Sequence, residues 1–187
     1  EFKYNLSELN KGYANRTLHV NLTDNTISEK PVIEDVKDKF VGGKGLGLRL
    51  LWDATRPETK WNDEDNAIVI SPGPLAGITQ YSGAGKSLVV TISPLTDSIM
   101  DSNVGGYFGP FLKFSGFDAI ELKGKAKKDV IVFIDGTTGK ISIEEVSGLP
   151  ADSHILAEVL TERYAKDEKD KINVAVVSAG TAADNSL

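Results

Sequence analysis

A chain of 187 residues that is 40% hydrophobic and 26% charged can bury one sizeable core and is too apolar to stay disordered. Its net charge of −6 argues against nucleic acid as a partner, because that partner requires a concentrated positive face. The absence of cysteine excludes disulfides, thiolate catalysis and thiolate-held metal clusters within these residues, and no apolar run approaches the roughly 18 residues of a membrane-spanning helix. Because the chain opens at Glu1-Phe2 without a methionine or a leader, we expect a cytoplasmic piece of a longer protein.

The first part of the chain combines short strands with one helix. In chain order we expect strands over 17–22 and 26–28 joined by a turn, a mostly buried helix over 45–54, and strands over 67–70, 86–93 and 119–123. Polar and apolar residues alternate in the first hairpin, whereas closely spaced leucines after a glycine cluster indicate the helix. Most of the 18 glycines lie between Gly42 and Gly124, so the backbone of this stretch bends sharply or approaches its neighbours closely.

The remaining part contains a second hairpin and a second helix. We expect strands over 130–134 and 141–143 joined by a turn at 136–139, a helix from Asp152 or Ser153 to about Asp167, and a buried strand over 172–177. Apolar residues of the helix recur on one stripe, which indicates that one side of it is buried.

These elements suggest an internal duplication. Residues 66–73 resemble residues 173–180 at an offset of 107, and in both copies a hairpin and then a helix precede a strand that ends in Ser-x-Gly. We therefore predict an α+β, mainly β fold of two related β-sheets with a pseudo-two-fold relation and a few helices. The first half covers about 13–125 and the second about 126–187, which is expected to be cut short soon after Gly180.

Two nucleotide-binding motifs fail on inspection. Residues 83–87 resemble the end of a phosphate-binding P-loop, but Gln80 stands where the first glycine belongs, and a strand rather than a helix is expected to follow. Residues 42–47 resemble a dinucleotide fingerprint without its glycine register, so we interpret them as a closely packed helix start.

A third segment is a better candidate. Asn103 is followed by Val104 and then by the pair Gly105-Gly106, whose bare backbone can reach a phosphate or a cation without a Cβ in the way. An aromatic-rich run follows. The alternative, a tight glycine bend that feeds a core helix, stays open on these residues alone.

Six segments in order carry a resemblance to a known family. They are residues 41–47 (VGGKGLG), 71–77 (SPGPLAG), 93–96 (SPLT), 102–109 (SNVGGYFG), 112–120 (LKFSGFDAI) and 123–126 (KGKA). Together they resemble the N-terminal domain of the tungsten-dependent aldehyde ferredoxin oxidoreductase family over nearly the whole chain. In that family this domain has two related β-sheets, and a tungsten carried by two pterin dithiolenes lies against it.

The resemblance implies a set of cofactor-binding residues. Asn103, Gly105 and Gly106 match positions whose backbone meets the pterin phosphates, and the carbonyl of Asn103 is implied as a ligand of the magnesium that bridges them. Lys86 stands where many members have an arginine that contacts pterin phosphate; lysine keeps the charge and loses the bidentate fork. No catalytic side chain is implied in residues 1–187, and a second glycine- and arginine-rich phosphate loop is expected downstream.

The resemblance also implies an activity for the whole protein. It would oxidise an aldehyde to a carboxylic acid at a tungsten, or molybdenum, bis-pterin centre and pass electrons through a 4Fe-4S iron–sulfur cluster in downstream domains to ferredoxin, in anaerobic metabolism. Aldehyde and ferredoxin are then the partners, with neither nucleic acid nor membrane, and a homodimer of the full-length enzyme is one assembly to test. The chain by itself is expected to be inactive.

Two alternatives stay open. The parent protein is a family member with another substrate, such as the active-site subunit of a ring-reducing acyl-CoA enzyme, or the chain is a non-catalytic binding or scaffolding module that kept the fold.

Overall fold

The computed structural model divides the chain into two compact units, Glu1–Glu145 and Val146–Leu187, and describes residues 1–185. The first unit contains strands β1 (Phe2–Lys3), β2 (Arg16–Asn21), β3 (Thr26–Pro31), β4 (Ala67–Pro72), β5 (Ser87–Ile92), β6 (Ile99–Val104), β7 (Ala119–Lys123), β8 (Val130–Asp135) and β9 (Lys140–Glu145), with helices α1 (Glu34–Phe40), α2 (Gly43–Ala54) and α3 (Phe108–Phe114). The second unit contains helices α4 (Ser153–Tyr164) and α5 (Thr181–Asp184) and a 3-10 helix η1 (Asp170–Asn173).

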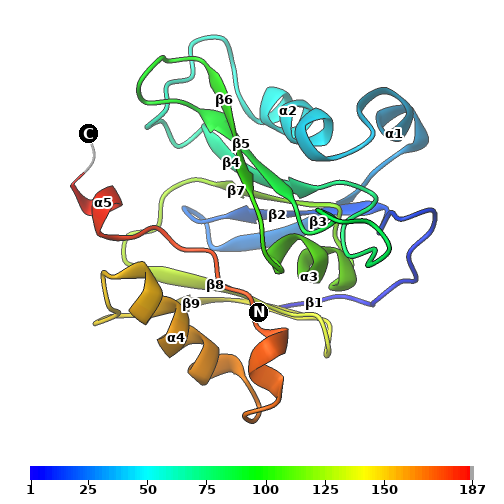
Figure 1. Ribbon diagram of the computed structural model, residues 1–187. Coiled ribbons are helices and arrows are strands. Elements are labelled where there is room, and N and C mark those ends of the chain that lie inside the picture. Colours follow the sequence, from blue (N-terminus) through cyan, green and yellow to red (C-terminus); the bar gives the residue numbers. More distant parts are fainter. Residues whose placement is uncertain (186–187) are drawn as a thin grey trace. The chain divides into compact units, whose positions relative to one another are not determined.

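Two sheets form the first unit. The larger has the order β3-β2-β7-β4-β5-β6, in which β2 and β7 run parallel and the other neighbours antiparallel (Figure 1). The smaller has the order β1-β9-β8 and is antiparallel throughout. The expected mainly β, two-sheet α+β fold is confirmed, with the six-stranded sheet drawn from the first predicted half and the β8–β9 hairpin from the second.

One face of the six-stranded sheet packs against α2. Leu46 and Leu51 of the helix meet Val69 and Val90 of the sheet in a buried cluster, and each such side chain stabilises the fold by roughly 1.5–3 kcal/mol. A Cβ on Gly47 would lie 2.8 Å from Val90 Cγ2, so the glycine lets α2 come close to β5. The expected close-packed helix start at this glycine cluster is confirmed.

The opposite face holds the second core. Leu18 of β2, Ile70 of β4 and Leu112 of α3 pack there with Phe117 and with Ile141 of the smaller sheet. The two sheets of the first unit therefore share one apolar interior, to which α3 contributes (Figure 1).

The second unit is mostly exposed, and its main helix begins as the sequence predicts. Asp152 caps α4, because its Oδ1 accepts hydrogen bonds from the backbone N–H groups of His154 and Ile155 at 2.9 and 3.1 Å. None of the helices within residues 1–185 has the length and apolar character needed to cross a membrane.

The strand expected over 172–177 is wrong. Residues 170–173 form η1, residues 174–180 have no regular structure, and Ile172 and Val177 are 78% and 49% exposed. A strand exists only when its backbone pairs with a neighbour, and no strand in the described part of the chain pairs with these residues. The predicted second copy of the repeat thus contains a hairpin and a helix, whereas its Ser-x-Gly segment is irregular, and the pseudo-two-fold relation stays a prediction.

Candidate functional site

The β5–β6 hairpin brings the predicted site residues together. Leu88 pairs with Asn103 and Ser87 with Val104, so the next position of the register sets Lys86 opposite Gly105. A Cβ on Gly105 would lie 3.7 Å from Lys86 Nζ, which means that the ammonium group lies beside this glycine. Lys86, Asn103 and Gly105 therefore lie on one face of the sheet.

Bare backbone lines the open end of this hairpin. Gly106 has a φ of +94°, and no atom lies within 4 Å of its Cβ position. A Cβ on Gly85 would lie 2.6 Å from the carbonyl oxygen of Gly106, so these two glycines pass each other closely. Gly105 and Gly106 are both exposed, as is Lys86. The loop offers amide and carbonyl groups beside a cation without any Cβ in between.

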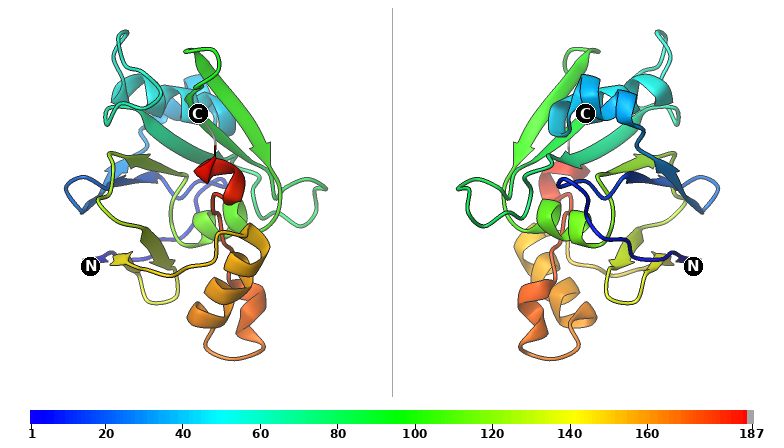
Figure 2. Two further views of the ribbon diagram at one scale, coloured as in Figure 1. Left: turned by 90° about the vertical axis from the view of Figure 1, so that its left-hand side faces the viewer. Right: turned by 90° about the vertical axis from the view of Figure 1, so that its right-hand side faces the viewer.

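A second cation lies on the same face. Lys44, in the first turn of α2, forms a 2.6 Å ion pair with Asp101, which is two residues before Asn103 on β6. Figure 2 shows α2, in blue, beside the green strand β6. The N-terminus of α2 has no side-chain cap, so its first N–H groups add to the positive potential there. Sequence reasoning assigned no role to Lys44, although residues 42–47 form one of the segments that carry the family resemblance.

The arrangement suits an anion with several oxygen atoms. Lys86 supplies charge, and the Gly105-Gly106 backbone supplies dipoles that can approach a phosphate closely. β5 follows Lys86 as a strand, so the exclusion of a P-loop, which continues into a helix, is confirmed. The glycine bend also feeds a core helix, because α3 begins at Phe108. Lys86 and Gly105 lie close together in the structure, while the phosphate contacts and the magnesium ligand at Asn103 stay predictions.

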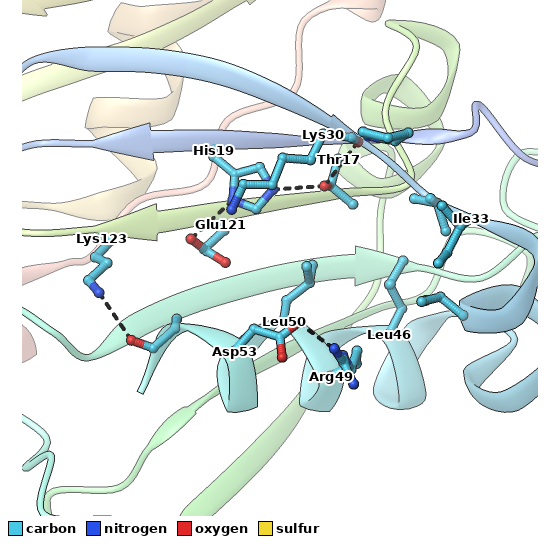
Figure 3. Close-up of a pocket in the computed structure, with 14 residues that line it drawn as sticks. Thr17, His19, Lys30, Ile33, Leu46, Arg49, Leu50, Asp53, Glu121 and Lys123 are labelled. Atoms are coloured by element: carbon cyan, nitrogen blue, oxygen red, sulfur yellow. Dashed lines mark hydrogen bonds and ion pairs between the residues drawn. The ribbon is translucent and has the colours of Figure 1, made fainter. Parts of the chain in front are cut away.

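A separate pocket lies between the sheet and the helices of the first unit. It encloses about 380 Å³ and is bounded by β2, β3 and β7 on one side and by α1 and α2 on the other (Figure 3). His19 and Glu121 project into it from the sheet, facing Leu46 and Leu50 on α2 (Figure 3). Sequence reasoning did not single out this pocket, since its polar residues are far apart in the chain.

The polar residues of this pocket are largely paired with one another. Thr17 Oγ1 lies 2.8 Å from His19 Nε2, and His19 Nδ1 lies 3.1 Å from Glu121 Oε1. The second contact has the distance of an ion pair but not the direction of a hydrogen bond, so Nδ1 lacks a directed partner. Near the rim, Arg49 Nε donates to Asp53 at 2.9 Å and Lys123 Nζ donates to the carbonyl of Ala54 at 3.0 Å.

The sequence and fold place the chain in a known class of oxidoreductase domains. The profile of the family "Aldehyde ferredoxin oxidoreductase, N-terminal domain" matches residues 17–187. The chain belongs to this family, and the expected resemblance is confirmed.

Several characterised proteins are similar to the chain. The tungsten-containing aldehyde ferredoxin oxidoreductase of Pyrococcus horikoshii is 35% identical over 176 residues, which cover 94% of this chain and 28% of that protein. The aliphatic sulfonate oxidoreductase, WOR-like subunit, of Pyrococcus furiosus is 36% identical over 184 residues, which cover 94% of this chain and 29% of that protein. The chain thus spans less than a third of the length of these relatives.

A solved structure is similar as well. The active site complex BamBC of benzoyl coenzyme A reductase, in complex with 1,5-dienoyl-CoA, superposes with a TM-score of 0.76 at 28% identity. The match covers 81% of this chain and 23% of that chain.

Proposed function

We propose that the chain is the cofactor-binding domain of a tungsten bis-pterin oxidoreductase that converts aldehydes to carboxylic acids and passes the electrons through an iron–sulfur cluster to ferredoxin. The observation that carries the proposal is the meeting of Lys86 with the bare Gly105-Gly106 backbone, in a chain whose relatives are tungsten-containing aldehyde ferredoxin oxidoreductases. The metal and its dithiolenes supply the redox chemistry when they are bound.

The part played by this chain is binding and orientation. Lys86 neutralises charge on a pterin phosphate, and the Gly105-Gly106 backbone donates to its oxygen atoms. The Asn103 carbonyl provides an oxygen ligand of the kind that magnesium prefers. Lys44 places a second ammonium group on the same face, where the ion pair with Asp101 fixes its position and balances its charge. The twisted sheet behind these residues holds them in place while the cofactor is bound.

Charge variants of Lys86 in the full-length protein test the proposal. Lys86→Glu is expected to lower tungsten and pterin content, whereas Lys86→Arg keeps or raises it, because a guanidinium restores the fork that suits phosphate. A charge-assisted contact contributes about 1.5–3 kcal/mol, so the affinity falls roughly 10- to 100-fold. Elemental analysis and pterin fluorescence give both contents per protein.

Lys127→Glu is the matched control, since Lys127 is another exposed lysine and the change in charge is identical. It should leave both contents unchanged. Equal metal content in Lys86→Glu and wild type would refute the assigned role of Lys86, and a full-length protein without metal or pterin would instead favour the non-catalytic scaffold.

A second candidate function has a specific observation in its favour. The solved structure that matches this chain belongs to a benzoyl coenzyme A reductase complex that holds a dienoyl-CoA. An aromatic acyl-CoA whose ring is reduced is therefore the alternative substrate to an aldehyde. Assays of the full-length protein with an aldehyde and with an aromatic acyl-CoA, each with a redox dye, separate the two.

A further inference from the structure

A fully buried lysine lies on α3, the helix that follows Gly106, and no carboxylate of the described residues forms an ion pair with it. Lys113, on α3, is 1% exposed and is the largest of the fully buried side chains. Its Nζ donates to the carbonyl oxygens of Gly12 and Gly73, at 2.7 and 2.5 Å. A buried ammonium is costly unless its hydrogen bonds are made, so its presence needs an explanation beyond packing.

Three glycine loops meet around this ammonium group. A Cβ on Gly12 would lie 2.4 Å from the carbonyl oxygen of Pro74, and a Cβ on Gly42 would lie 3.0 Å from Pro74 Cδ and 3.2 Å from Gly73 Cα. These loops therefore pack backbone against backbone. Lys113 ties two of them to α3, and the third, at Gly42, immediately precedes α2.

Both helices adjoin the candidate site. α3 begins two residues after Gly106, and its Gly109 fits against Ser87, the neighbour of Lys86, since a Cβ on Gly109 would lie 2.1 Å from Ser87 Oγ. The first turn of α2 carries Lys44, which is paired with Asp101 on β6. The ammonium group is thus connected to the site from two directions.

We propose that Lys113 is the positioning residue of the Lys86–Gly105 site: its buried ammonium group fixes the starts of α2 and α3 and thereby the spacing between Lys86 and the bare backbone. This inference deepens the proposed function, because it concerns the same phosphate-binding face. Lys113 itself acts through the Gly12 and Gly73 carbonyls.

The test compares two lysine variants of the 187-residue chain. In Lys113→Met the buried ammonium is lost. In the control Lys123→Met, a partly buried lysine is lost that also donates to a backbone carbonyl but lies on β7, which does not pair with β5 or β6. Inorganic pyrophosphate is titrated while the amide signals of Gly105 and Gly106 are followed by NMR. We expect Lys113→Met to weaken pyrophosphate binding about tenfold or more. Lys123→Met should leave the affinity unchanged, even where it destabilises the fold as much as Lys113→Met does.

Hydrogen exchange provides a readout that does not need pyrophosphate. The amides of Phe111 and Gly45 are hydrogen-bonded to Tyr107 O and Gly42 O, at 2.9 and 3.1 Å, and report on the starts of α3 and α2. Lys113→Met should accelerate exchange at these two amides selectively, whereas Lys123→Met should not. Unchanged exchange at both amides in a folded Lys113→Met protein would overturn the proposal.

Pyrophosphate titration tests the phosphate site, and hydrogen exchange tests the role of Lys113 independently of it. If wild type shows no pyrophosphate shifts at Gly105 and Gly106, the phosphate-binding role fails, and exchange alone then decides the role of Lys113. Lys113→Gln replaces the ammonium by an uncharged amide with two N–H donors and serves if the methionine variant does not fold. In wild type, NMR couplings from the Lys113 ammonium to the Gly12 and Gly73 carbonyl carbons are expected; an ammonium coupled to neither would also overturn the proposal.

Discussion

Glycines around the site serve two different purposes, depending on whether their Cβ positions are open to solvent or enclosed by neighbouring atoms. Gly105 and Gly106 are open to solvent, so their missing side chains leave backbone accessible to a ligand. Gly109 and Gly47 are enclosed, and a Cβ on either would meet a neighbouring side chain at 2.1 or 2.8 Å. The same residue type thus marks a binding surface in one loop and close packing in a helix.

Gly109→Ala should destabilise the first unit although alanine favours a helix. The new methyl would meet Ser87 Oγ at 2.1 Å and Pro72 Cβ at 3.3 Å, and both neighbours are buried. Overpacking of this kind costs about 1–3 kcal/mol, measurable as a lower midpoint of urea unfolding. Gly73→Ala is the control, because no atom lies within 4 Å of its Cβ position; it should stay within about 0.5 kcal/mol of wild type. Equal midpoints for the two variants would show that α3 can move aside.

Lys113 gives the stability of the protein a predictable dependence on pH. Burial lowers the pKa of Lys113 from 10.5 to about 8, and the charge of Asp118 partly opposes this. Between these two values the unfolded chain binds more protons at this residue than the folded protein, so its contribution to the free energy of unfolding rises with pH across this window. We expect the difference in that free energy between wild type and Lys113→Met to grow by about 1–3 kcal/mol from pH 8 to pH 10.5. Denaturant unfolding at several pH values measures it, and a difference that shrinks with pH would contradict the lowered pKa.

At the scale of elements, strand pairing places residues that no local pattern connects. β2 and β7 are parallel neighbours, and their register sets His19 directly opposite Glu121 on a face that α2 only partly covers. The two side chains are only 9% and 11% exposed. Removing one partner of such a buried pair leaves the other without compensation, and this lowers the free energy of unfolding.

Glu121→Gln tests that pair. The substitution keeps the size of the side chain and removes the charge that faces His19 Nδ1, so the free energy of unfolding should fall by about 1–3 kcal/mol. Glu58→Gln, at an exposed position, is the matched control and should change it by less than about 0.5 kcal/mol. If Glu121→Gln is as stable as the control, the 3.1 Å contact has no net value and the pocket tolerates a neutral lining.

At the scale of the whole molecule, both described core clusters belong to the first unit. Every residue in them lies between Phe2 and Ile143, and the second unit contributes none. The candidate site lies in the first unit as well. A chain that ends after Glu145 therefore retains the features on which folding and phosphate binding are predicted to depend.

We expect residues 1–145 to fold cooperatively on their own. Their two sheets share an interior that is complete within this range, so the midpoint of thermal unfolding should lie within about 5 °C of that of the full chain, the shift expected for roughly 1 kcal/mol. Circular dichroism and the amide signals of Gly105 and Gly106 would show whether fold and site persist. Loss of cooperative unfolding in the truncated chain would mean that residues 146–187 contribute to the core.

The sequence by itself determined the local features and the family. Apolar alternation located most strands, Asp152 marked the start of α4, and the order of the glycine-rich segments identified the family. Each of these depends on residues close together in the chain or on an ordered set of short motifs, which one sequence displays in full.

The tertiary structure alone decided the features that depend on distant partners. Residues 172–177 have the composition of a buried strand but no pairing strand among the described residues. Lysine is usually an exposed residue type, yet the ammonium group of Lys113 is buried against the carbonyls of Gly12 and Gly73. The same holds for His19 and Glu121, which meet only because β2 and β7 are neighbours. Hydrogen-bond partners and burial are properties of the folded chain, so a pattern of residue types cannot state whether a given backbone or ammonium group will find them.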